Sequence, residues 1–339
     1  MMARRRPVTW LGIAFSGQLG PISTAPSTPP HYTHMPARND PQRTLQRRRQ
    51  AQRRRPAPRP NRTNQTDHLS AHAHQRTPQL GSPPAPGYHH PQERHQTNSK
   101  EKANINIASL NVNGASASRE GMSCIEKWAA INHMIYNERI AILALQETHL
   151  DQTLLDQIIE CFGKNLEIMN SPLPANPCAS AGVAFIINKA LIRPKELTLT
   201  EIEPGRAIMI RLKWLESCET SIVNVYVPHD RDAQPDFWAK AMLNRRTLRL
   251  PLPDFVLGDF NVTEDSIDRA PAHLDRPRAT DAIREVRREW NIQDTWRHTH
   301  PDTRCFTYHA NVDGEQIQSR LDRIYTAHEI SQHVFDWQI

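Results

Sequence analysis

The sequence predicts a mixed α/β domain built in layers, and three observations support this fold class. From Asn104 onward, apolar stretches with the composition of strands alternate with amphipathic stretches with the spacing of helices. The alternation has no strict period and shows no internal repeat, which argues against a barrel of eight strand–helix units. Several apolar stretches are continuous, as in strands that are covered on both faces.

Six stretches are expected to form strands because they are rich in apolar and β-branched residues. They are residues 104–112, 140–145, 182–188, 207–215, 221–227 and 255–261. The C-terminal stretch 305–326 predicts a hairpin whose turn contains Asp313-Gly314, a pair typical of tight turns.

Three stretches, 123–139, 236–248 and 281–290, are expected to form amphipathic helices. In the first, Ser123 and Glu126 have the spacing of a capping box, in which each side chain bonds the other residue's backbone N–H. Its apolar residues recur on one helical face, at Ile125, Trp128, Ile131 and Ile135.

The charge distribution divides the chain into two parts. Residues 1–100 hold 16 Lys+Arg against 3 Asp+Glu, 15 of the 27 prolines and 8 of the 17 histidines. Such a composition buries too little apolar surface to offset chain entropy, so we expect a disordered Arg/Pro/His-rich arm. Residues 101–339 hold 26 Lys+Arg against 33 Asp+Glu and are expected to form one domain with a net charge of −7.

Within the arm, QRRRQAQRRRPAPRP carries two Arg triplets. They fit a nuclear import signal, a nucleic-acid contact or a low-complexity stretch without a selected role. The start, MARRRPVTWLGIAFSG, resembles a signal or transit peptide only weakly. Five cysteines without paired spacing argue against disulfides and zinc, and no apolar run is long enough for a membrane span. We therefore expect an intracellular, nuclear protein without membrane contact.

Polar residues follow the predicted strands at their C-terminal ends, and this is where chemistry is expected. In the open sheets of layered α/β domains, ligands bind in the crevice at this edge. Asp259 and Asn261 are two residues apart in an extended segment, so their side chains point to one face. The full set is Asn111, Asn113, Glu147, Tyr226, Asp259, Asn261 and Asp322.

These residue types suit metal-assisted hydrolysis of a phosphodiester. Glu147, with Asn111 or Asn113, offers the oxygen ligands that Mg²⁺ (or Mn²⁺) prefers. Such an ion would stabilise charge on a phosphoryl oxygen. Asp259 could accept a proton from an attacking water molecule. Hydrogen bonds to a phosphate oxygen could come from Asn261 and Tyr226.

Five motifs in this order, LNVNG, LALQETHL, VNVYVPHD, VLGDFN and SRLDRIY, resemble the endonuclease/exonuclease/phosphatase superfamily over nearly all of residues 104–339. The form of the first two is most similar to the endonuclease domain of LINE-type (non-LTR) retrotransposons. The resemblance implies a four-layered α/β sandwich, in which two packed mixed sheets are flanked by helices. It also implies a Mg²⁺-dependent nuclease that acts on DNA, with a reverse transcriptase downstream in a full-length relative.

The resemblance assigns roles residue by residue. Glu147 corresponds to the metal-binding Glu, and Asn111 to an Asn that helps to hold metal and phosphate. Tyr226 and Asn261 correspond to phosphate contacts, and Asp259 to the residue that activates or orients the water. Asp322 corresponds to an Asp that orients a catalytic His. Asn113 stands where the repair enzymes carry Asp, which implies a weaker metal site.

The catalytic His is the main departure from the family pattern. It belongs to a Ser/Thr-Asp-His motif, whereas this chain ends in HEISQHVFDWQI. We interpret His309, His328 and His333 as ordinary surface or loop residues. The domain is therefore expected to lack its last motif and its last core strand, which would expose sheet edges and reduce activity.

Three functional hypotheses remain open at this point. The first is a metal-dependent DNA endonuclease that nicks its substrate. The second is a retroelement remnant that has lost catalysis and only binds nucleic acid, with its Arg-rich arm contacting the phosphates. The third is a phosphatase or phosphodiesterase of another branch of the superfamily, such as those acting on inositol lipids or sphingomyelin.

Overall fold

The computed structural model describes residues 11–16, 104–114, 123–194, 197–215, 218–312 and 314–339. The helices are α1 Cys124–Asn137, α2 Gln152–Phe162, α3 Gln234–Thr247, α4 Pro277–Trp290 and α5 Thr295–Thr299, with short 3₁₀ helices at Ser266–Asp268 and His328–His333. The strands are β1 Leu11–Ser16, β2 Asn104–Asn111, β3 Ile140–Gln146, β4 Leu166–Ser171, β5 Val183–Asn188, β6 Leu197–Glu203, β7 Ala207–Leu215, β8 Cys218–Tyr226, β9 Phe255–Asp259, β10 Arg269–Ala270, β11 Ile292–Gln293, β12 Tyr308–Val312, β13 Glu315–Ser319, β14 Asp322–Ala327 and β15 Val334–Gln338.

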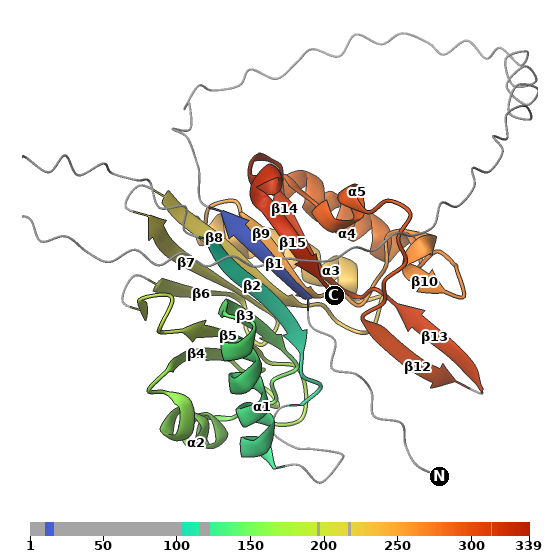
Figure 1. Ribbon diagram of the computed structural model, residues 1–339. Helices are drawn as coiled ribbons and strands as arrows, with labels where there is room; N and C mark the ends of the chain where they lie inside the picture. Colours follow the sequence, from blue (N-terminus) through green and yellow to red (C-terminus); the bar gives the residue numbers. More distant parts are fainter. Residues whose placement is uncertain (1–10, 17–103, 115–122, 195–196, 216–217, 313) are drawn as a thin grey trace, which may run out of the picture. The chain divides into compact units, whose positions relative to one another are not determined.

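Two six-stranded mixed sheets form the centre of the described part of the chain (Figure 1). The first has the order β15-β1-β2-β3-β5-β4, and the second has the order β11-β14-β9-β8-β7-β6. In each sheet the central pair is parallel, β2 with β3 and β8 with β9, and the outer pairs are antiparallel. All six strands predicted from the sequence are present.

Three apolar clusters define four layers. One lies between the two sheets and includes Ile107, Phe185, Ile210 and Leu257. The second packs α1 and α2 on the outer face of the first sheet. The third packs α3 and α4 on the outer face of the second sheet. The strands β3, β5 and β9 are buried along their whole length because both faces of each sheet are covered. The expected four-layered α/β sandwich is confirmed.

Local sequence accounts for the helix boundaries. Ser123 and Glu126 form the predicted capping box at the start of α1, with bonds of 3.2 Å and 2.7 Å to each other's backbone N–H. The predicted face of α1 is buried at Trp128 and Ile131. The helix α4 ends at Asn291, whose left-handed backbone closes the last turn. No helix among the described residues is long and apolar enough to cross a membrane.

The predicted C-terminal hairpin is also present. β12 and β13 pair antiparallel and continue into β10, so they form a small third sheet. Asp322 does not belong to this hairpin, because it begins β14 in the second large sheet. The helix α2 and the strands β4 and β6 were not predicted, since their short stretches mix polar and apolar residues without a clear period.

One short segment within residues 1–100 belongs to the folded domain. Residues 11–16 form β1, which lies in the first sheet between β2 and β15. This strand was not predicted because the composition was averaged over residues 1–100, and six apolar and small residues change that average little. The neighbour of β2 at this side of the sheet is thus supplied from the N-terminal part of the chain. The Arg triplets and the rest of the predicted arm lie outside the described residues.

Candidate functional site

The predicted strand-end residues converge at one edge of the two sheets. Asn111 ends β2, Tyr226 ends β8 and Asp259 ends β9. Tyr226 and Asp259 are register partners in the parallel pair of the second sheet. Asp322 lies opposite Asp259 in the antiparallel pair of β9 and β14. The parallel centres of both sheets therefore deliver their polar ends to the same place.

Asn111 connects the two sheets at this edge. Its Nδ2 donates to Oε1 of Glu147 at 2.9 Å and to Oδ2 of Asp259 at 2.9 Å. Its Oδ1 accepts the backbone N–H of Asn113 at 2.9 Å. One amide thus fixes the distance between a carboxylate from the first sheet and a carboxylate from the second. Asn113 itself is an exposed turn residue with a left-handed backbone, and its role as a metal ligand stays a prediction.

A second set of amides connects the two sheets beside Asn111, whose register partner on β3 is Gln146. Gln146 donates from Nε2 to Oδ1 of Asn224 at 2.7 Å. Nδ2 of Asn224 donates to the carbonyl oxygens of Leu145 and Ala184, each at 2.9 Å. Gln146 and Asn224 are fully buried. Because buried polar groups are costly unless they are bonded, this network fixes the relative position of the sheets under the site.

Asp259, which is buried, and Asp322, which is half-buried, form a pair of carboxyl groups. Oδ1 of Asp259 accepts the backbone N–H of Asn261 at 2.9 Å, and the residue is 5% exposed. Burial raises the pKa of both carboxyl groups, and the charge of Asp259 raises the pKa of Asp322 further. Among the described residues, Oδ1 of Asp322 is buried and has no hydrogen-bond partner. A proton or a cation would compensate the charge of this pair.

Tyr226 lies close to the carboxylate of Glu147 and to the guanidinium of Arg206. Burial raises the pKa of its phenol well above the ordinary value, and the charges of Glu147 and Asp259 raise it further. Tyr226 is therefore a neutral hydrogen-bond donor at physiological pH. The guanidinium of Arg206 lies over its ring, 4.9 Å from the centroid, and Nη1 of Arg206 donates to the Tyr226 carbonyl at 3.4 Å.

Strained backbone positions gather at the same edge. Glu147 and Asn261 have positive φ angles of 54° and 50°, which non-glycine residues adopt rarely. Nδ2 of Asn261 donates to the Val227 carbonyl at 2.9 Å, and Gln234 donates to the Asn261 carbonyl at 3.2 Å. These bonds hold the Asn261 backbone in place. Such strain is maintained where the surrounding structure determines the conformation, as it often does at functional sites.

Two histidines border this edge, although the sequence interpretation gave neither a role. Nδ1 of His229 lies 3.4 Å from Oδ1 of Asn261. Nε2 of His149 lies 4.0 Å from Oε2 of Glu147, and burial lowers the pKa of His149 more than Glu147 raises it. His328 is exposed, and His309 and His333 are half-buried.

Residues that support Asp322 were also missed. Oγ1 of Thr307 accepts the backbone N–H groups of Leu321 and Asp322 at 3.1 Å and 3.0 Å. The backbone N–H of Phe260 donates to the Leu321 carbonyl at 3.0 Å. These bonds fix the start of β14 against the end of β9. No local sequence signal marks Thr307, because it lies fourteen residues before Leu321.

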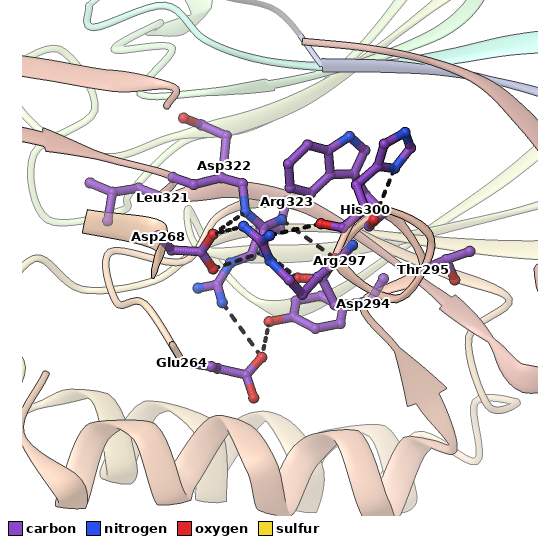
Figure 2. A network of polar contacts seen from close by, with 12 residues as sticks. Glu264, Asp268, Asp294, Thr295, Arg297, His300, Leu321, Asp322 and Arg323 are labelled. Carbon is purple, nitrogen blue, oxygen red and sulfur yellow. Dashed lines mark hydrogen bonds and ion pairs between the residues drawn. The ribbon is translucent and has the colours of Figure 1, made fainter. Parts of the chain in front are cut away.

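A buried network of charges surrounds this segment (Figure 2). Arg320 donates from Nε and Nη2 to the two oxygens of Asp268, each at 2.9 Å, and from Nη2 to Oδ2 of Asp294 at 2.5 Å. Arg297 also donates to Asp268. Arg320 is 2% exposed. Hydrogen bonds to Arg320 lower the pKa of Asp268 although burial alone would raise it.

The network joins three segments that are distant in sequence. Asp268 ends the 3₁₀ helix after β9, Asp294 caps α5, and Arg320 stands two residues before Asp322. Beside it, Arg323 packs on the Phe260 ring and donates to the Val262 carbonyl. The signal in the sequence is the pair of arginines that flanks Leu321-Asp322 in SRLDRIY.

The donor set of the site consists of oxygens. Asn111 Oδ1 and the carboxylates of Glu147, Asp259 and Asp322 are hard ligands of the kind that Mg²⁺ and Mn²⁺ bind. No group of three His, Cys, Asp or Glu side chains in the described part of the chain is arranged to enclose a metal ion by itself. The set fits an ion such as Mg²⁺, which keeps several water ligands and is held by one or two carboxylates.

The sequence matches the profile of the endonuclease/exonuclease/phosphatase family over residues 108–338. A curated relative, the transposon TX1 uncharacterized 149 kDa protein of Xenopus laevis, is 32% identical over 157 residues, which are 46% of this chain and 11% of the relative. The chain thus spans about a tenth of that protein. This match confirms the similarity to retroelement proteins.

Solved structures agree with the fold. The AP endonuclease LMAP of Leishmania major is 18% identical with a TM-score of 0.55, and the match covers 68% of this chain and 81% of that one. The 3′ phosphatase NExo of Neisseria, solved with a product DNA hairpin, is 15% identical with a TM-score of 0.51, and covers 67% and 88%. The chain has two packed mixed sheets, and the polar ends of β2, β8 and β9 lie at one edge. The family profile matches most of its length. The chain therefore belongs to the endonuclease/exonuclease/phosphatase family.

Proposed function

We propose that this chain is a nuclease that hydrolyses phosphodiester bonds of DNA with the help of a divalent metal ion and nicks one strand. The observation that carries the proposal is the bridge made by Asn111, which holds Glu147 and Asp259 at hydrogen-bond distance from one amide. A carboxylate for a metal ion and a carboxylate for a water molecule are needed side by side in such a reaction.

Glu147 and Asn111 are the residues that we expect to hold the ion. Glu147 has one carboxylate oxygen bonded to Asn111, and its other oxygen lies 4.0 Å from His149. When bound, a divalent ion supplies a positive charge that stabilises a developing charge on a phosphoryl oxygen. The unpartnered buried oxygen of Asp322 is an independent sign that the site is short of positive charge.

Asp259 is our proposed general base. It is buried and held by Asn111 and the Asn261 backbone, so its orientation is fixed before substrate binds. Burial raises its pKa, which brings a carboxylate closer to the value at which it accepts a proton effectively at neutral pH. Asp322, register-paired with Asp259, is proposed to keep a proton or a cation close to it.

Tyr226 and Asn261 are proposed to donate hydrogen bonds to the scissile phosphate. The raised pKa of Tyr226 keeps its hydroxyl group protonated, and its position at the end of β8 places it beside Asp259. Asn261 uses Nδ2 for the Val227 carbonyl, which leaves the second hydrogen of its amide for a ligand. Donors that are fixed in advance stabilise transition-state charge most effectively.

DNA is the substrate class that we propose, because the solved structures of similar fold are an AP endonuclease and a 3′ phosphatase bound to product DNA. The test uses the full chain, supercoiled plasmid, and Mg²⁺ against EDTA. We expect nicked circles with Mg²⁺ only, and a loss of at least about 10²–10³-fold in rate for Asp259→Asn. Asp236→Asn, an exposed carboxylate on α3, is the matched control and should nick normally.

The proposal is wrong if Asp259→Asn nicks as fast as the control. A second candidate is a chain that binds nucleic acid without cleaving it. It is favoured by Asp322, whose Oδ1 has no hydrogen-bond partner among the described residues. Binding of the supercoiled plasmid without nicking at any Mg²⁺ concentration would support this alternative.

A further inference from the structure

The strand β1 occupies an interior position in the first sheet, although it comes from a distant part of the chain. It pairs antiparallel with β2 on one side, where Ile13 is the register partner of Ile107, and antiparallel with β15 on the other, where Ala14 is the partner of Phe335. Its sequence, LGIAFS, alternates large apolar residues with small ones, as is common in strands. The stretch that resembles a transit peptide therefore has a structural position.

The slot between β2 and β15 needs a strand that pairs with both of them. Among the described strands, β15 pairs with β1 alone, so an empty slot would leave β15 without a neighbour and β2 with an open edge. Val334 is buried, and Trp337 packs against the core between the sheets. Removing β1 would thus loosen part of that core. An open edge next to a buried strand also recruits strands from other chains.

The connection between β1 and β2 differs from that of an ordinary antiparallel pair. Residues 17–103 join the two strands, whereas hairpins usually use two to about five residues. Effective concentration is about millimolar for a short linker and falls with about the −3/2 power of its length. The composition of this connector predicts a disordered chain, and such a chain, about twenty times longer than a hairpin turn, would lower the effective concentration about a hundredfold, to roughly ten micromolar.

We propose that the slot between β2 and β15 is a strand-addition site, and that β1 of a second copy of this chain fills it to form a strand-exchanged dimer. The same backbone hydrogen bonds form whether β1 belongs to the same chain or to another, so exchange sacrifices no contact. The length of the connector then determines the equilibrium between monomer and dimer, because the long connector lowers the effective concentration of β1 from the same chain at the slot. This inference does not rest on the proposed nuclease activity.

The test measures the oligomeric state of the full chain by sedimentation velocity from about 1 to about 200 micromolar. We expect a monomer–dimer equilibrium with a midpoint on the order of ten micromolar. Ile13→Pro removes a backbone N–H from the middle of β1 and should abolish the dimer, because proline is excluded from interior strands. Thr24→Pro, outside β1, is the matched control and should dimerise as the native chain does.

A fluorescent peptide of residues 9–18 probes the slot directly. It should bind the Ile13→Pro chain, and an excess should convert the native dimer to monomer. A native chain that stays monomeric over the whole range overturns the proposal, as does an Ile13→Pro dimer as stable as the native one. If Ile13→Pro does not fold, the peptide competition with the native dimer decides, and a dimer unaffected by excess peptide overturns the proposal.

Discussion

Asp322→Asn should stabilise the metal-free protein in alkaline solution. Burial and the charge of Asp259 raise the pKa of Asp322 above its ordinary value near 4. The folded state therefore binds more protons than the unfolded state above about pH 4, and stability falls as pH rises through the raised pKa. Asparagine has nearly the same shape and no charge, so it removes this loss of stability.

The expected gain is about 1–2 kcal/mol at about pH 9. One unit of pKa shift corresponds to about 1.4 kcal/mol, and a buried unpaired oxygen costs about 1–3 kcal/mol. Oδ1 of Asp322 is such an oxygen, although the residue as a whole is half-buried, so we take the lower part of this range. Below about pH 4 the carboxyl group is protonated in both the folded and the unfolded state, and the difference should almost vanish.

The assay is urea unfolding of the full chain in EDTA at both pH values, with Asp302→Asn, an exposed carboxylate in a turn, as the control. The variant should gain stability only at the higher pH, and in a separate plasmid assay with Mg²⁺ it should lose nicking activity. Equal destabilisation at the two pH values would refute the reasoning, because it would mean that the Asp322 carboxylate makes a stabilising contact.

Other variants test the remaining parts of the site and of its support. Mg²⁺ should raise the melting temperature of the native chain, Glu147→Gln should abolish this rise, and an unchanged rise would place the ion elsewhere. Arg206→Ala should lower kcat/KM for plasmid about tenfold, since it removes a cation worth about 1–2 kcal/mol beside the phenol, while Arg206→Lys retains most activity. Asp268→Ala should cost about 3–5 kcal/mol in urea unfolding because it leaves Arg320 partly unpaired in the interior, and a loss under 1 kcal/mol would contradict this. Gly258→Ala should destabilise by more than about 3 kcal/mol, because its φ is 141° and a Cβ would lie 1.9 Å from a carbonyl oxygen of β8; circular dichroism melting measures it.

The sequence was sufficient for six of the strands and for the polar residues at their ends, because these are local properties. A continuous apolar run such as Phe255–Leu257 predicts a buried strand whatever lies around it. That Asn111 would bond both Glu147 and Asp259 could not be derived from the pattern, since the contact joins residues 148 positions apart in different sheets. Strand order and sheet packing must be known before such a contact can be stated.

The missed residues share the same physical reason. Thr307 and Arg206 belong to loops and strand ends with no distinctive spacing, and their roles arise from what they contact. The strand β1 was missed for a different reason, because composition was averaged over a long stretch that contains six residues of strand. Strand signals inside a low-complexity region need to be judged over windows of strand length.

Two pairs of acidic side chains are connected to neighbouring positions of the chain, one to Arg320 and one to Asp322, and they differ in their partners. Asp268 and Asp294 accept hydrogen bonds from Arg320, so their charges are neutralised inside the protein. Asp322 lies two residues after Arg320 and has a buried oxygen with no hydrogen-bond partner among the described residues. It lies opposite the carboxyl group of Asp259. Asp268 and Asp294 are paired with an arginine of the same chain, whereas Oδ1 of Asp322 has no such partner among the described residues. The oxygen of Asp322 that lacks a partner is best explained if a ligand supplies positive charge when the site is in use.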